Sequence, residues 1–179
     1  LLSSGSGVLD VAGGKGQLAF CLTGRRCIPS TICDPRPFDV LRMLKMMTIN
    51  HVLRLRKDEC FRAAADHHRV VGISGDHVHV TLATPGHIRT WFIYPPAHDV
   101  RIKMMMSEDY FGEELSSGSA DEVAALDTAM DTCSVVVGFH PDQATESIVD
   151  YALAKGKPFA VVPCCVFPKL FPDRKTPAG

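Results

Sequence analysis

The sequence lacks the long apolar runs, the leader-like start and the biased composition that would place it in a membrane, on an export route or among disordered chains. It has no stretch of about 18 uncharged apolar residues, so we expect no membrane-spanning helix. The first residues lack the basic, apolar and small-residue order of a signal peptide. With 179 residues, 46% hydrophobic and 22% charged, the composition predicts one globular domain over residues 1–179, in the cytoplasm or the nucleus. Because the chain begins without Met, we expect it to be trimmed there, with a leading loop before Val8.

The cysteines lack the spacing of a disulfide framework. There are seven, an odd number, and only Cys164 and Cys165 stand together. This use of cysteine is typical of free thiols in a reducing compartment. A closed set of metal ligands is missing too, because the pairs His67-His68 and His77-x-His79 are not completed at zinc-site spacing, so we expect no metal.

Charge is balanced overall, with a formal net charge of −1, but it is divided between two segments. Residues 42–69 contain seven basic and three acidic side chains, whereas residues 101–150 contain two basic and eleven acidic ones. The basic segment indicates either a nucleic-acid patch or the solvated faces of helices. Solvated faces are the more economical interpretation, because aromatic side chains that stack on bases are scarce there.

Short apolar runs alternate with helical segments, which is typical of an α/β domain with a parallel sheet. The expected strands are residues 8–11, 28–33, 77–83, 91–94, 102–106, 134–137 and 159–162. The expected helices are residues 16–22, 38–47, 52–65, 119–130 and 143–154. Residues 46–118 carry no motif that can be placed.

Helix boundaries have their own signals. Gly24 is expected to end the first helix, and Ser119 with Glu122 has the spacing of a capping box. Asp142 is a candidate N-cap for the last helix, which Gly156 ends. On that last helix the expected core residues are Ile148, Val149, Ala152 and Leu153.

The most informative segment is VLDVAGGKGQLAF, residues 8–20, which combines a strand, a glycine-rich turn and the start of a helix. Gly14 and Gly16 allow positive φ and a close approach of the backbone to a ligand. Asp34 follows the second strand, where a carboxylate can accept hydrogen bonds from both hydroxyls of a ribose. Together these features predict a nucleotide-binding turn; the alternative is a plain tight turn before a helix.

Two classes of ligand fit such a turn. Gly14, Gly16 and Ala19 satisfy G-x-G-x-x-A, the fingerprint of a turn that binds the pyrophosphate of a dinucleotide. Asp10 argues against that ligand, because a carboxylate at the end of the first strand repels a pyrophosphate. It suits a cation such as S-adenosylmethionine, which carries an ammonium and a sulfonium. Alternatively, Asp10 only accepts hydrogen bonds from the turn.

Residues 10–16, DVAGGKG, resemble motif I of class I S-adenosylmethionine-dependent methyltransferases, D-x-G-x-G-x-G, with Ala12 in place of the first glycine. The resemblance implies a single Rossmann-like α/β domain, a mostly parallel twisted sheet with helices on both faces. It implies a site for S-adenosylmethionine formed by Asp10, Ala12, Gly13, Gly14, Gly16, Asp34 and Pro35. Asp34 would bind the ribose hydroxyls, and Asp109 or its neighbours Ser107 and Glu108 would lie near the adenine.

The segments GFHPDQATESIVDYALAKGKPF, residues 138–159, and VVPCCVF, residues 161–167, resemble a subgroup of these enzymes. Its members have His-Pro-Asp after the fourth strand and Cys-Cys after the fifth, and some methylate RNA. The resemblance makes RNA, either tRNA or rRNA, the first expected acceptor, ahead of a protein side chain or a small molecule. The sheets of these enzymes usually have two further strands after the fifth, but only thirteen residues follow Val166. We therefore expect an open edge that a second copy or a partner subunit could cover.

Candidate catalytic residues follow the fourth and fifth strands, because ligands of open parallel sheets bind at the carboxyl ends of strands. His140 is expected to act as a base or to shape its loop. Asp142 is a second candidate, although a helix cap is the simpler role. Cys164 and Cys165 would be nucleophiles, metal ligands or apolar fillers. Two further functions stay open, namely a nicotinamide- or flavin-dependent oxidoreductase and a non-catalytic binding subunit.

Overall fold

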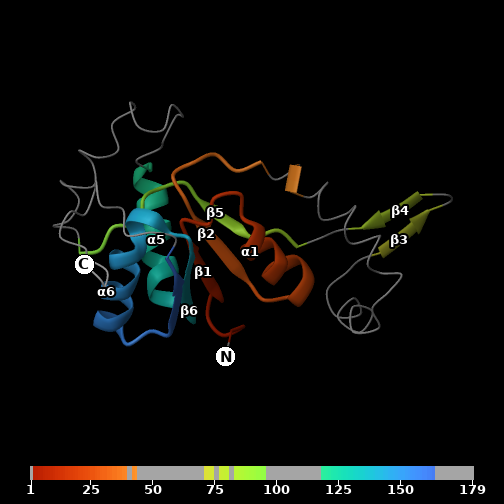
Figure 1. Cartoon of the computed structure of the whole chain (residues 1–179). Coiled ribbons are helices and arrows are strands. Elements are labelled where there is room, and N and C mark those ends of the chain that lie inside the picture. The colour runs from red at the N-terminus through yellow and green to blue at the C-terminus, as the bar shows by residue number, and fades with distance from the viewer. Residues whose placement is uncertain are drawn as a thin grey trace.

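The computed structural model describes residues 2–39, 42–43, 71–74, 77–80, 83–95 and 118–163. Among these residues, one sheet has only parallel neighbours, and its spatial order is β5 (Gly86–Ile88), β2 (Ser30–Cys33), β1 (Val8–Val11), β6 (Val135–Phe139) and β7 (Phe159–Val162). A separate antiparallel pair consists of β3 (Val71–Ser74) and β4 (His77–Val80). The helices labelled in Figure 1 are α1 (Gln17–Phe20), α5 (Ala120–Thr132) and α6 (Thr145–Lys155). The chain therefore has an α/β fold.

Strand β1 lies at the centre of this sheet, and all four of its residues are buried. Val8 is in register with Ser30 of β2 on one side and with Val135 of β6 on the other. The chain thus leaves β1 towards one edge of the sheet and later returns to its other side at β6. Because parallel strands end at the same edge, the carboxyl ends of β1, β2 and β6 meet at this topological switch point.

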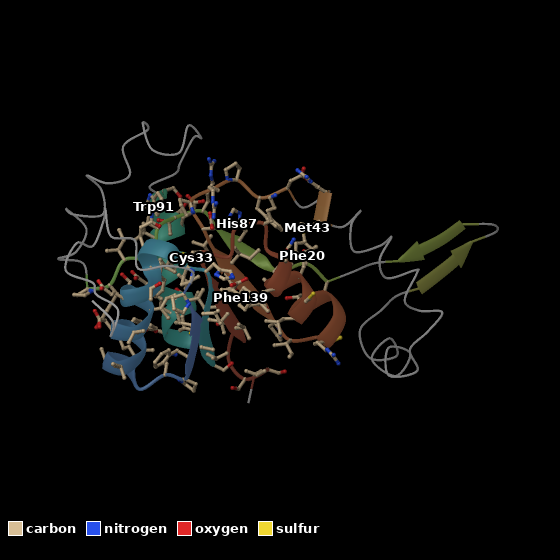
Figure 2. All side chains as sticks on the ribbon, viewed as in Figure 1. Phe20, Cys33, Met43, His87, Trp91 and Phe139 are labelled. Carbon is tan, nitrogen blue, oxygen red and sulfur yellow. The ribbon has the colours of Figure 1, made fainter. Side chains whose placement is uncertain are left out.

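Helices cover both faces of the sheet, with α5 and α6 on one side and α1 on the other (Figure 1). Leu9 and Val11 of β1 point to the side of α5 and α6, where they join a core cluster with Tyr151 of α6. On the side of α1, Phe20 packs against Met43 and the partly buried Phe38 (Figure 2). The alternation of β1 therefore directs Asp10, between Leu9 and Val11, towards the face that α1 covers.

The expected end of the first helix at Gly24 is wrong. After α1 the helix continues as a π-helical segment, Cys21–Arg25, and Gly24 lies inside it. Cys27 takes the left-handed conformation instead, with φ of 55°. The reason is local: the Ile28 N–H donates to the Leu22 carbonyl at 3.0 Å, which folds the chain back against the last turn.

The expectation of a strand at residues 91–94 is also wrong. Residues 91–94 form no strand, and β5 lies immediately before them. The strand ends at Ile88 because the Thr90 N–H turns back to the Ile88 carbonyl at 3.0 Å. The aromatic residues that predicted a strand pack on a helix instead: the rings of Phe92 and Tyr94 meet the Tyr151 ring edge-on, with centroids 5.8 and 5.5 Å apart.

Helix α5 confirms the predicted capping box. The Ser119 hydroxyl accepts from the Glu122 N–H at 3.2 Å, and a Glu122 carboxylate oxygen accepts from the Ser119 N–H at 2.8 Å. The predicted strands at 8–11, 134–137 and 159–162 are confirmed as β1, β6 and β7, within two residues at their ends. The strand expected at 28–33 begins at Ser30, and the one expected at 77–83 is described as β4.

Helix α6 corrects two expectations. It begins at Thr145 rather than at 143, after a 3-10 turn (Asp142–Ala144), and its N-cap is Ala144, not Asp142. The turn is held by the Ala144 N–H, which donates to the Pro141 carbonyl at 2.8 Å. Leu153, expected in the core, is 68% exposed, because the buried face of α6 consists of Ser147, Ile148, Tyr151 and Ala152. The predicted end at Gly156 is confirmed, in the left-handed conformation.

Three predicted segments lie wholly or largely outside the described residues. They are the helices at 38–47, of which residues 42–43 are described as helical, and 52–65, and the strand at 102–106. In the part of the chain that the structure describes, no helix has the length and apolar character needed to cross a membrane.

Lys157 is expected to stabilise the fold by closing the carboxyl end of α5. Its ammonium donates to the carbonyls of Asp131 and Cys133 at 2.7 and 2.8 Å. Lys157→Met keeps the aliphatic stem and removes both hydrogen bonds, so we expect it to lower the free energy of unfolding by about 1–2 kcal/mol in urea titrations followed by circular dichroism.

The matched control is Lys155→Met. Lys155 forms an exposed ion pair with the Asp131 carboxylate at 3.7 Å, and such pairs contribute at most about 1 kcal/mol and often nothing measurable. An equal loss of stability in the two variants would contradict the role assigned to Lys157.

Candidate functional site at the carboxyl edge of the sheet

The glycine-rich turn is held in the left-handed conformation at three positions, with φ of 54° at Ala12, 54° at Gly14 and 69° at Gly16. The Ala12 N–H donates to the Cys33 carbonyl at 2.8 Å, so the turn is fixed to the end of β2. A Cβ atom on Gly16 would lie 2.6 Å from the side chain of Ile32, which leaves room only for glycine. Ala12 adopts a conformation that favours glycine, and its position is that of the first glycine of the D-x-G-x-G-x-G pattern.

Asp34 fastens the same turn through its side chain. One carboxylate oxygen accepts from the Gly14 N–H at 2.8 Å, and Asp34 is only 1% exposed. Burial by itself raises the pKa of this carboxyl, but hydrogen bonds and the positive charge of Arg36, helped by the Gly14 N–H, hold it below its ordinary value. Asp34 is therefore ionised and fixed beside the glycine turn.

The neighbours of Asp34 close the loop after β2. Pro35 is buried, and its carbonyl accepts from the Arg89 guanidinium at 3.2 Å. The His87 ring nitrogen lies 3.2 Å from the backbone carbonyl of Asp34, and its ring meets that of Phe38 at 5.6 Å.

Asp10 is a buried carboxylate without a hydrogen-bond partner. It is 1% exposed, and neither of its oxygens has a donor within hydrogen-bonding geometry among the residues that the structure describes. A Cβ atom on Gly13 would lie 2.8 Å from one oxygen, so the backbone of the turn rests directly on the carboxylate. The interpretation of Asp10 as an acceptor for the N–H groups of the turn is therefore wrong.

The pKa of Asp10 reflects this position. Burial raises it from the ordinary value of 3.8 to about 7, and the negative charge of Asp34 adds to the rise. The backbone N–H of Ala19 opposes the rise but makes no hydrogen bond of normal geometry with the carboxylate. Near neutral pH, a positive charge placed beside Asp10 would favour its ionised form.

The end of β6 supplies the third part of this edge. His140 is exposed and takes a left-handed conformation, with φ of 58°, while its N–H donates to the Val162 carbonyl at 2.9 Å. Phe139 is 59% exposed, and its ring meets the His140 ring edge-on at 4.9 Å (Figure 2). An aromatic side chain and a titratable ring are thus presented to solvent beside the end of β1.

The structure therefore brings together Asp10, the glycine turn and Asp34, and it places His140 at the end of the neighbouring strand. Asp142 lies in the 3-10 turn after it. The predicted residues Cys164, Cys165 and Asp109, with the alternatives Ser107 and Glu108, fall outside the described residues.

Sequence reasoning missed Arg36. Its guanidinium forms an ion pair with Asp34, with nitrogen and oxygen atoms 3.0 Å apart, and lies over Gly14. The available signal was its position two residues after a predicted ribose-binding carboxylate, in Asp34-Pro35-Arg36, where the two side chains can fold onto each other.

Two further observations concern a hollow elsewhere in the described residues and the possible ligands of a metal ion. A hollow of about 430 Å³ lies at the opposite, amino-terminal edge, where Ser30 and Thr31 of β2 and Gly86 of β5 contribute to its wall. No group of three or more His, Cys, Asp or Glu side chains in the described ranges is arranged to hold a metal ion.

Comparison of the chain with protein-family models, with curated proteins and with solved structures finds no match.

The raised pKa of Asp10 predicts a specific pH dependence of stability. Above pH 4 an unfolded Asp10 is ionised, whereas the folded one stays protonated up to about pH 7, so the folded state binds more protons between these values. The stability of the wild type should therefore fall, relative to Asp10→Asn, by about 2–4 kcal/mol as the pH rises from 4 to 8.

The wild type and Asp10→Asn share every other titrating group, so the pH dependence of the difference between their free energies of unfolding reports on Asp10 alone. Measuring both free energies in urea at pH 4.5, 6 and 8 tests the prediction. Parallel pH curves for the wild type and Asp10→Asn would show that Asp10 is not a buried, uncompensated carboxylate.

Proposed function

We propose that the chain is an S-adenosylmethionine-dependent methyltransferase that binds this cofactor at the carboxyl edge of β1, β2 and β6. The observation that carries the proposal is Asp10, a buried carboxylate directly beneath the turn that has no hydrogen-bond partner in the described part of the chain. A buried negative charge is costly unless a positive charge compensates it. S-adenosylmethionine has two positive charges, whereas a dinucleotide brings two negative phosphates to the same turn.

Different residues around Asp10 would bind different parts of this cofactor. Ala12, Gly13, Gly14 and Gly16 form the turn against which its methionine part would lie, with Asp10 beneath. Asp34 would accept hydrogen bonds from the ribose hydroxyls, and Pro35 would shape the wall beside them. This division agrees with the motif I resemblance of residues 10–16, in which Ala12 takes the left-handed conformation expected of the first glycine.

When bound, S-adenosylmethionine supplies a methyl group that is lost from sulfur to an acceptor lone pair, leaving S-adenosylhomocysteine. The chain's main task is to hold donor and acceptor in line. His140, exposed at the end of β6, is the candidate base that takes the acceptor's proton. Its exposed neighbour Phe139 offers a flat apolar surface beside it.

RNA is the acceptor we propose first. The basic segment 42–69 and the likeness of residues 138–159 to a subgroup that includes RNA methyltransferases support it. The exposed Phe139 supports it too, because aromatic side chains bind unstacked bases with about 1–3 kcal/mol per base.

A nicotinamide dinucleotide is the second candidate, and one observation favours it. Arg36 lies beside Asp34, where an arginine can bind the 2′-phosphate of NADP. Against it, the α-helix after the turn has only four residues before it widens into the π-helical segment, so few aligned peptide dipoles face a pyrophosphate. The Asp10 carboxylate also disfavours the pyrophosphate, because the two groups repel each other when both are negatively charged.

Methyl transfer tests the proposal. The wild type, incubated with radiolabelled S-adenosylmethionine and separate pools of RNA and of protein, should label the RNA, and ribonuclease should release the label. Asp34→Asn should reduce the transfer at least tenfold, because a charged hydrogen-bond partner of the ribose contributes about 1.5–3 kcal/mol.

Asp150→Asn is the matched control, since Asp150 is an exposed carboxylate on α6, away from this edge, and should leave the rate unchanged. Label in the protein pool alone would replace RNA as the acceptor. Transfer that is equal in Asp34→Asn and the wild type would contradict the binding site proposed here.

A further inference from the structure

Asp34, the residue proposed to bind the ribose, is already saturated with donors. One oxygen accepts from the Arg36 backbone N–H at 2.9 Å and from the Arg36 Nε–H at 3.0 Å. The other accepts from the Gly14 N–H at 2.8 Å and from the Arg36 Nη2–H at 3.0 Å. A carboxylate has about four lone-pair positions, so all of them are occupied.

The same contacts make Asp34 inaccessible. Its side chain is 1% exposed, whereas that of Arg36 is 43% exposed, so the guanidinium is the outer layer and the carboxylate the inner one. A ribose cannot reach Asp34 while the guanidinium stays where it is. Two of the four donors are the backbone N–H groups of Gly14 and Arg36, and the other two belong to the Arg36 guanidinium.

We propose that Arg36 is a displaceable cover over the ribose-binding carboxylate, a proposal that rests on the function proposed above. The two guanidinium hydrogen bonds occupy as many acceptor positions as the two hydroxyls of a ribose need. On binding, the hydroxyls of an adenosyl ligand replace these two bonds, while the N–H groups of Gly14 and Arg36 keep theirs. The guanidinium, already partly exposed, turns towards water.

The cover makes the site selective for ligands that carry both ribose hydroxyls. Bidentate hydrogen bonds between arginine and a carboxylate are among the strong ones in proteins, so a ligand must replace both of them to compete. A ligand without the diol would break the two guanidinium hydrogen bonds and form none with Asp34 in their place. Displacement also lowers the apparent affinity, because only the uncovered fraction of the protein is competent to bind.

The test uses S-adenosylhomocysteine as the probe, titrated by calorimetry into the wild type and into Arg36→Met, which keeps much of the apolar stem and removes the guanidinium. We expect Arg36→Met to bind at least tenfold more tightly. The charge-matched control is Arg26→Met, which removes the same charge from an exposed side chain at the end of the π-helical segment and should bind as the wild type does.

The diol is tested with adenosine and 2′,3′-dideoxyadenosine. The gain in Arg36→Met should appear with adenosine and be absent with the dideoxy compound, which has no hydroxyls for Asp34. A gain of equal size with both compounds would mean that the substitution only widens the site, and it would overturn the proposal.

Arg36→Lys provides a second variant in case Arg36→Met does not fold, which thermal unfolding will show. Lysine keeps the charge but not the planar pair of donors, so a smaller gain, of about threefold, is expected. The wild type could bind S-adenosylhomocysteine clearly while these variants bind it equally well or more weakly. That result would contradict the role of Arg36 as a cover, but it would not contradict the proposed function.

Two further outcomes separate the two claims. Binding by Arg36→Met but not by the wild type would support both, since the cover then hides a competent site. Binding of NADPH by the wild type and its loss in Arg36→Met would show that Arg36 holds a phosphate, and it would overturn both the cover and the methyltransferase proposal.

Discussion

The candidate site depends on the position of β1 between β2 and β6. This pairing places the turn after Val11, the loop after Cys33 and the loop after Phe139 at one edge of a parallel sheet. The Ala12 N–H and the Gly14 N–H then fasten the turn to the end of β2, through the Cys33 carbonyl and the Asp34 carboxylate. The positions of the functional groups therefore follow from strand order and from two hydrogen bonds to the backbone of the turn.

Two carboxylates in this small region are held in opposite states. Asp34 accepts four hydrogen bonds and its pKa is lowered, whereas Asp10 accepts none and burial raises its pKa to about 7. Opposed shifts of this kind are typical of functional sites, because each environment prepares one group for one task. A cation would compensate the unsatisfied carboxylate, whereas a neutral diol would reach the saturated one only by replacing the Arg36 guanidinium.

Local signals in the sequence predicted much of this region. The glycines of the turn, the buried strand before it and the capping box of Ser119 and Glu122 act within a few residues, and the structure agrees with each. Asp34 was identifiable because it follows a short apolar strand.

The failures have two physical causes. The helix runs past Gly24 because the Ile28 N–H caps it locally at the Leu22 carbonyl, whereas the aromatic run at 91–94 packs on the distant Tyr151 rather than pairing in the sheet. The pKa values of Asp10 and Asp34 also depend on burial and on contacts that form only in the folded chain. Their sequence positions are similar, each at the end of a strand, yet Asp34 has the Arg36 guanidinium beside it, whereas Asp10 lies against the backbone of the turn and near the negative charge of Asp34.

We propose that the turn and Asp10 receive a cationic adenosyl ligand. The most direct test is calorimetric titration of S-adenosylmethionine into the wild type and Asp10→Asn at pH 6 and pH 8, with NADH and NADPH as comparators. Comparing the two proteins cancels the titration of the ligand itself. We expect S-adenosylmethionine to bind and NADH not to bind, and affinity in the wild type to gain from pH 6 to pH 8 relative to Asp10→Asn, because the cation favours ionised Asp10. Binding of the dinucleotides alone, or the same pH dependence in both proteins, would contradict the account.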